Sequence, residues 1–219
     1  MVNPTGGIAD TIVITVVSVL WPAADPAFST GPDKSESMLK LSENPPIVFP
    51  VNSSVEDICG LWWVAHTKAR NEKALAWCLA GWDIPYFLPL REKTTIRSGR
   101  RFKSLLPLFS GYLFFAGSSE QRLQALTTNR IAQVIEVVDQ AGLVRQLSQI
   151  HRALDSGLSL DPHPRLKSGD GCRVTAGPLM GMEGIVVRKK SITRLLLEVE
   201  ILGQAAAVEI DSELLEPIE

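Results

Sequence analysis

Residues that build covalent or metal-binding sites are scarce in this chain of 219 residues. The three cysteines and three histidines are Cys59, Cys78, Cys172, His66, His151 and His163. No cysteines form a Cys-x-x-Cys pair, and no histidine stands at ligand spacing from a cysteine or carboxylate. An odd number of scattered cysteines is typical of reduced, structural thiols. The pattern predicts an intracellular, cytoplasmic protein without a disulfide framework, metal site or cofactor.

Sequence motifs of enzymes are missing as well. The chain has no phosphate-binding Gly-x-x-x-x-Gly-Lys-[Ser/Thr] loop, no Gly-x-Ser-x-Gly elbow and no His-Glu-x-x-His zinc motif. Gly169-Asp170-Gly171 is too short to be more than a turn. We therefore expect no catalytic residue, and a binding function in place of an enzymatic one.

A hydrophobic segment of membrane-spanning length is also missing. The apolar run Ile12–Leu20 is too short to cross a bilayer. The basic start of a secretory signal is absent, because the first cation is Lys34. The chain is then rich in proline, serine and aspartate up to Val51, so residues 1–59 are predicted to be a disordered extension. A further hypothesis is that translation starts at Met38.

Charge is distributed unevenly along the chain, although the net charge is only −2. Residues 1–59 carry 2 basic and 7 acidic side chains, residues 60–160 carry 13 and 7, and residues 161–219 carry 7 and 10. A basic centre between acidic ends favours a middle domain that meets a polyanion or an acidic protein surface. The alternative is that these cations are simply solvated.

A glycine-rich segment near the C-terminus lies between runs of apolar residues. Gly177, Gly181 and Gly184 follow one another at spacings of four and three, and Pro178 comes directly after the first. Glycine permits the positive φ of a tight strand connection, and proline favours a turn. The segment predicts a small all-β module over residues 169–219, in which these four residues maintain the fold.

The middle of the chain predicts a sheet covered by helices. Leu61–Thr67 has the composition of a strand, and Asn71 is a candidate cap for the helix after it. The apolar stripes of the first and last helices are Leu75, Cys78, Leu79, Trp82 and Leu143, Leu147, Ile150, Leu154. Ser118 and Gln121 form a capping box for a short helix between them. The order β-α-β-β-β-α-β-α predicts an α+β fold with a mixed sheet.

Three segments together resemble the NusG family. They are the Trp62-Trp63 strand with Thr67-Lys68-x-Arg70-x-Glu72-Lys73 after it, the run Pro107-Leu108-Phe109-x-Gly111-Tyr112-Leu113-Phe114, and the glycine-rich segment, which resembles a KOW motif. The resemblance implies a NusG N-terminal-type mixed sheet with covering helices over residues 60–158. A linker over residues 159–168 and a small SH3-like β-barrel, the KOW module, over residues 169–219 would follow.

This resemblance implies a monomeric transcription elongation and antitermination factor of the cytoplasm. Family members bind RNA polymerase through an apolar patch of the N-terminal domain. The matching positions here are Trp63, Phe109, Tyr112 and Phe114. Aromatic residues in strands are more often core than interface, so both interpretations are open. In alternation Tyr112 and Phe114 share one face of their strand, and Leu113 and Phe115 share the other.

The basic residues of the middle domain are expected to lie near upstream or non-template DNA. They are Lys68, Arg70, Lys73, Arg97, Arg100, Arg101 and Lys103. Such contacts would be directed at phosphates, although a solvated hairpin face is an equal alternative for any single residue. The KOW module would recruit a ribosomal small-subunit protein or the termination factor Rho.

The short basic hairpin at residues 91–103, the missing proline at position 110 and the unusual N-terminal segment favour a specialised paralogue of the family. Ser110 stands where the family usually has proline, which predicts a looser loop before Tyr112. Asn129-Arg130 stands where the family usually has a Pro-Gly or Arg-Gly turn, so the resemblance assigns no contact residue to that segment. The rival hypothesis is a KOW protein associated with the ribosome or with RNA that never contacts polymerase.

Overall fold

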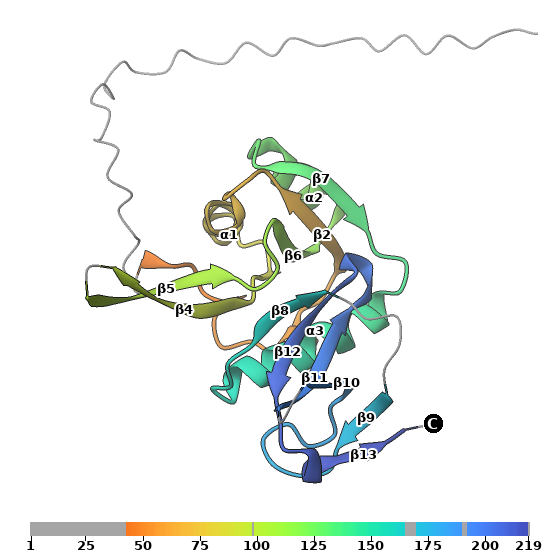
Figure 1. The fold of residues 1–219 in the computed structure, drawn as a ribbon. Coiled ribbons are helices and arrows are strands. Elements are labelled where there is room, and N and C mark those ends of the chain that lie inside the picture. Colours follow the sequence, from red (N-terminus) through yellow and green to blue (C-terminus); the bar gives the residue numbers. More distant parts are fainter. Residues whose placement is uncertain (1–42, 98, 165–169, 190–191, 219) are drawn as a thin grey trace, which may run out of the picture. The chain divides into compact units, whose positions relative to one another are not determined.

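A five-stranded antiparallel sheet forms the centre of the N-terminal domain (Figure 1). In the computed structural model, which describes residues 43–97, 99–164, 170–189 and 192–218, the strand order is β1-β3-β6-β2-β7. The strands are Val48–Phe49 (β1), Leu61–Thr67 (β2), Tyr86–Phe87 (β3), Tyr112–Gly117 (β6) and Ile131–Glu136 (β7). All strand pairs in this sheet are antiparallel, so the expected mixed sheet is not formed. Strands β2 and β3 run in the same direction, but β6 lies between them and pairs antiparallel with both.

Helices cover both faces of this sheet, which confirms the predicted α+β class. Helices α1 (Glu72–Gly81) and α2 (Ser119–Thr127) pack on the face that carries Leu113 and Phe115. Helix α3 (Gln140–Asp155) packs on the opposite face, which carries Phe114. The alternation expected along β6 is therefore observed, and each of its two faces belongs to a different core cluster.

The ends of the helices follow local sequence signals only in part. Ser118 and Gln121 form the predicted capping box of α2. The Asn71 side chain makes no capping bond to α1, because its amide donates to the Ala69 carbonyl oxygen. The stripe predicted for α1 is also partly wrong, since Trp82 lies beyond the last helical residue and is partly exposed.

Ordered structure begins well before residue 60. Strand β1 pairs with β3, and the short helix η2 (Val55–Asp57) buries Val55 in the core next to α3. A capping box between Ser54 and Asp57 holds η2. Residues 43–59 are thus part of the N-terminal domain, because they complete an edge of its sheet and its core. The predictions for residues 1–42, Met38 included, lie outside the described residues.

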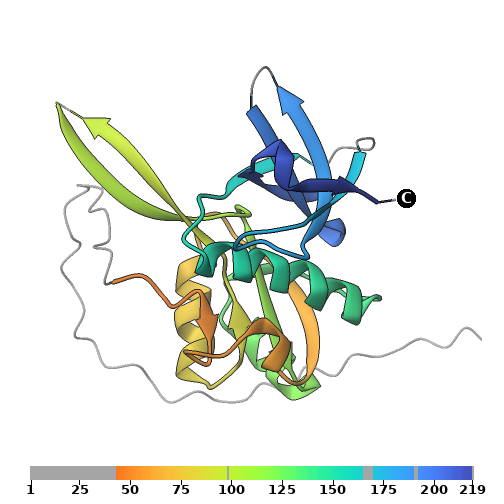
Figure 2. The same ribbon diagram turned by 90° about the horizontal axis from the view of Figure 1, so that it is seen from below.

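A separate two-stranded ribbon joins the central part of the domain. Strands β4 (Leu90–Arg97) and β5 (Arg100–Pro107) pair along their full length and extend away from the sheet (Figures 1 and 2). Their register runs from Leu90 opposite Pro107 to Arg97 opposite Arg100. No other strand pairs with either one in the described part of the chain.

The C-terminal residues form a second, β-rich module. Its elements are β8 (Asp161–Pro164), β9 (Asp170–Val174), β10 (Glu183–Lys189), β11 (Ile192–Val199), η3 (Glu200–Leu202), β12 (Gln204–Glu209), η4 (Ser212–Leu214) and β13 (Leu215–Pro217). The strand order is β13-β9-β10-β11-β12-β8. Strand β13 pairs with β9, and β8 lies at the opposite edge of this strand order. Four residues of the expected linker form β8, which pairs with β12.

Helix α3 contacts this module as well as the sheet (Figure 2). Gln149 Oε1 accepts from the Glu183 backbone N–H at 3.2 Å, and Gln146 Oε1 accepts from the Glu200 N–H at 3.1 Å. Arg152 donates to the Met180 carbonyl oxygen at 3.1 Å. Because these residues are three apart along α3, they lie on one face of the helix. In the described part of the chain no helix is both long and apolar enough to span a membrane.

Candidate functional site

Three of the four aromatic residues expected to contact polymerase lie in the core. Trp63 packs under α1 on Phe115, with ring centroids 5.5 Å apart. Phe109 meets Phe114 edge-on at 6.3 Å on the face covered by α3, where Phe114 is 0 % exposed. All three side chains are buried, so they hold the sheet and the helices together and offer little surface to a partner.

Tyr112 is the member of this set that reaches the surface. It begins β6 and stacks on His66 near the end of β2, with ring centroids 5.1 Å apart and planes inclined by 25°. Both residues are half-buried, and they are direct partners in the β2–β6 pairing. We call this pair of rings the aromatic rim.

Two hydrogen bonds fix the turn that enters the aromatic rim. The Gly111 N–H donates to Glu72 Oε1 at 2.6 Å, and the Gly111 carbonyl accepts from the Thr67 N–H at 2.8 Å. Gly111 has a φ of +85°, which favours glycine at this position. A buried carboxylate thus secures the loop at Ser110, where the missing proline predicted looseness.

A polar cluster forms where the β2–α1 loop meets the α2–β7 loop. Lys68 Nζ donates to Asn129 Oδ1 at 2.6 Å, and the guanidinium of Arg130 donates to Asn71 Oδ1 at 2.8 Å. The Lys68 N–H also donates to the Arg130 carbonyl at 2.8 Å. Lys68 and Arg70 are exposed next to it. The sequence pattern assigns no role to Asn129 or Arg130, because only the left-handed preference of Asn after a helix marks this loop.

Lys73 has a structural position instead of an exposed one. Its ammonium group donates to Asn44 Oδ1 and to the Leu105 carbonyl oxygen, both at 2.5 Å. Desolvation by burial lowers the pKa of Lys73, and the neighbouring Glu72 carboxylate opposes that shift. The side chain therefore anchors α1 to the root of the ribbon, and we no longer expect it to contact DNA.

The remaining basic residues lie on the ribbon. Arg100, Arg101 and Lys103 are exposed, and Lys103 forms an ion pair with Glu92 at 2.9 Å. Arg97 pairs with Arg100 in the strand register, but its side chain lies outside the described residues. Exposed ion pairs contribute little to stability, so these cations are available for contacts with other molecules.

The glycine-rich segment forms the connection between β9 and β10. Gly177 and Gly181 have φ values of +83° and +82°, with Pro178 directly after the first. The Gly181 N–H donates to the Val174 carbonyl at 2.8 Å and closes the turn. Gly184 is required for lack of space and not for its φ, because an added Cβ there would collide with the Leu196 carbonyl oxygen. The segment is thus needed for the backbone geometry of the module.

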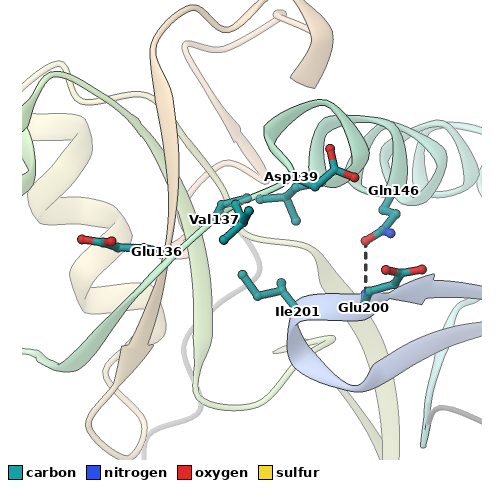
Figure 3. A pocket seen from close by; sticks show the side chains of 8 residues that line it. Glu136, Val137, Asp139, Gln146, Glu200 and Ile201 are labelled. Carbon is teal, nitrogen blue, oxygen red and sulfur yellow. Dashed lines mark hydrogen bonds between the residues drawn. The ribbon is translucent and has the colours of Figure 1, made fainter.

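A pocket of about 370 Å³ lies where β7 leads into α3 (Figure 3). Val137, Leu143 and Ile201 give it apolar walls, and its carboxylates are Glu136, Asp139 and Glu200. Asp139 caps α3 by accepting from the Gly142 N–H at 2.8 Å, so one of the three carboxylates has a structural role. Elsewhere in the described residues, too, no three His, Cys, Asp or Glu side chains gather as a metal site.

The N-terminal domain matches a known family. Residues 60–156 match the family model described as transcription termination factor nusG. The matched range starts one residue before β2 and ends one residue after α3, so it includes the aromatic rim, the polar cluster and the ribbon. These residues, which make up less than half of the chain, are therefore similar to the NusG family.

Comparisons with other known proteins add little to this assignment. One solved structure, the crystal structure of MjSpt4:Spt5 complex conformation B, is 13% identical and covers 73% of this chain and 97% of that chain, with a TM-score of 0.22. No curated protein matches the chain.

Proposed function

We propose that this protein is a transcription elongation and antitermination factor that binds RNA polymerase through the aromatic rim of its N-terminal domain. The observation that carries the proposal is the stacked Tyr112–His66 pair on a NusG-like domain whose other matched aromatics are buried. Of the four aromatic residues expected from the sequence to contact polymerase, the proposal keeps Tyr112 and adds its neighbour His66.

The physics of the aromatic rim supports this assignment. Tyrosine combines a large apolar ring with a hydroxyl group, and interface residues that contribute most to binding are enriched in tyrosine. The turn at Gly111 is fixed from both sides, so little conformational entropy is lost when a partner covers Tyr112. Replacement of the ring is expected to cost about 2 kcal/mol of binding free energy.

A second part of the proposal concerns DNA beside the polymerase. Lys68 and Arg70 are exposed next to the polar cluster, which holds the two loops at fixed positions. We expect them to contact phosphates of upstream or non-template DNA, because cations on loops bind the nucleic-acid backbone without reading sequence. Binding should therefore weaken as salt rises.

The C-terminal module is proposed to recruit a second partner. A module of this size, without a catalytic constellation, fits the KOW role of binding a ribosomal small-subunit protein or Rho. We also propose that the factor is a monomeric, cytoplasmic, specialised paralogue. The Asn129-Arg130 loop supports the last point, because its polar cluster differs from the Pro-Gly or Arg-Gly turn usual in the family.

The test is a binding titration of the full chain against core RNA polymerase. Tyr112→Ala is expected to weaken binding roughly 30-fold, as loss of about 2 kcal/mol requires. Trp77→Ala is the matched control, because Trp77 is an exposed aromatic on α1, which packs on the opposite face of the sheet. Circular dichroism of each variant separates lost contact from lost folding.

Two results would contradict the proposal. Equal losses in Tyr112→Ala and Trp77→Ala would remove the aromatic rim as the anchor. An absence of polymerase binding, with capture of ribosomal subunits or RNA by the same chain, would favour the rival function of a ribosome- or RNA-associated protein.

A further inference from the structure

The β4–β5 ribbon has two chemically different faces. The strand register pairs Lys93 with Ser104 and Thr95 with Phe102, while Thr94 pairs with Lys103 and Ile96 with Arg101. Because side chains alternate along a strand, these two sets of pairs lie on opposite faces. The first set, with Arg100, is the stacking face, and the second set, with Glu92, is the paired face.

The stacking face carries an aromatic ring among cations. Phe102 is 38 % exposed, and Arg100 and Ser104 lie two residues away on the same strand, about 7 Å on either side. Lys93 lies diagonally across the ribbon from Phe102 and is exposed. No residue of this face is acidic, so its cations face no carboxylate from their own surface.

The paired face differs in each of these respects. Its exposed apolar side chain is Ile96, which is 66 % exposed but has no ring on which a base could stack. Glu92 pairs with Lys103 at 2.9 Å and neutralises one of its two cations. The two faces therefore offer a matched comparison within one hairpin, because Phe102 and Ile96 belong to neighbouring cross-strand pairs.

An exposed ring between cations is the arrangement that binds unpaired bases. Aromatic side chains stack on the bases of single strands, and flanking cations hold the phosphates, with no requirement for sequence. A duplex exposes its phosphates but hides the faces of its bases, so Phe102 would add little to duplex binding. A protein surface with acidic groups would use the cations alone and would not distinguish Phe102 from Ile96.

We propose that the stacking face of the ribbon is a binding site for single-stranded nucleic acid, with Phe102 stacked on a base and Lys93 and Arg100 on adjacent phosphates. The proposal deepens the nucleic-acid contact of the proposed function and rests on it. It adds to the contact expected at Lys68 and Arg70 a second one, on one face of the ribbon.

The test is fluorescence anisotropy of the full chain with a labelled single-stranded oligonucleotide of about 12 nucleotides at low salt. DNA and RNA of the same sequence, and the corresponding DNA duplex, are measured in parallel. Phe102→Ala is expected to weaken single-strand binding about tenfold, as loss of one stacked base requires. Phe102→Trp should retain binding, and Ile96→Ala should stay within about twofold of the parent protein.

A second pair of variants tests the cations. Lys93→Ala should weaken single-strand binding and reduce the slope of log K against log salt by about 0.7, the value for one phosphate contact. Lys103→Ala is its control and should change the slope less, because Glu92 already pairs with that lysine. Dependence on Phe102 and Lys93 with either DNA or RNA supports the site.

Three outcomes would overturn it. These are equal effects of Phe102→Ala and Ile96→Ala, tighter binding to the duplex without any effect of Phe102→Ala, and no binding to nucleic acid while polyglutamate is bound. The last outcome would assign the ribbon to an acidic protein partner. Polymerase is absent from these titrations, so failure here is distinguishable from failure of the aromatic rim.

Discussion

At the scale of single residues, two glycines of the C-terminal module are required for different physical reasons, a close backbone approach and a positive φ. Gly184→Ala places a Cβ against the Leu196 carbonyl oxygen, a backbone atom that cannot move independently. Gly177→Ala meets no atom within 4 Å and carries only the strain of a φ of +83°. We expect Gly177→Ala to cost about 1 kcal/mol and Gly184→Ala at least about 2 kcal/mol in urea unfolding. Equal costs would show that close approach does not explain Gly184.

A second residue-scale prediction concerns acid stability at η2. The Ser54 hydroxyl and backbone N–H both donate to Asp57, which lowers the pKa of that carboxyl. A lowered pKa in the folded state contributes stability above the ordinary value near 3.8 that is lost as pH falls through the lowered one. Ser54→Ala should raise the pKa of Asp57 in an NMR titration. An unchanged Asp57 pKa would contradict the bonding described.

At the scale of elements, the Gln140 side chain continues a strand ladder. Beyond the end of β7, Gln140 Oε1 accepts from the Trp62 N–H at 2.8 Å and Gln140 Nε2 donates to the Trp62 carbonyl at 3.1 Å. Gln140→Ala leaves both groups of a buried residue without this partner. We expect a loss of about 1–3 kcal/mol in the free energy of unfolding. Gln124→Ala, on the exposed surface of α2, should stay within about 0.5 kcal/mol.

Sequence reasoning succeeded for elements that are specified by neighbouring residues. The box at Ser118 and the stripe of α3 depend on spacings of three and four residues, so both could be predicted. Strand β8 and the ladder made by Gln140 join segments far apart in the chain, and no local pattern marks them. For the aromatic set, alternation showed that Tyr112 and Phe114 share a face, but not that α3 buries one of them.

At the scale of the whole molecule, α3 packs against both the central sheet and the C-terminal module through one core. Leu143 and Leu147 of α3, Phe114 of the sheet, and Leu195 of the C-terminal module lie in one continuous cluster of buried residues. Units that share a core lose contacts together, so they are expected to unfold cooperatively. Gln146, Gln149 and Arg152 add three hydrogen bonds at the contact, each worth about 0.5–1.5 kcal/mol.

This arrangement is testable because the aromatic residues are distributed unevenly. Residues 161–219 contain no Trp, Tyr or Phe, so tryptophan fluorescence reports on the region before them, whereas far-ultraviolet circular dichroism reports on both. In the parent protein the two unfolding curves should coincide. Replacement of Gln146, Gln149 and Arg152 by alanine removes the three hydrogen bonds to the C-terminal module. Alanine has the highest helix propensity, so α3 itself is not weakened. The fluorescence and circular dichroism unfolding curves should then separate. Arg145→Ala, exposed on the same helix, should leave them coincident. Separate curves already in the parent protein would mean that the module folds independently of α3.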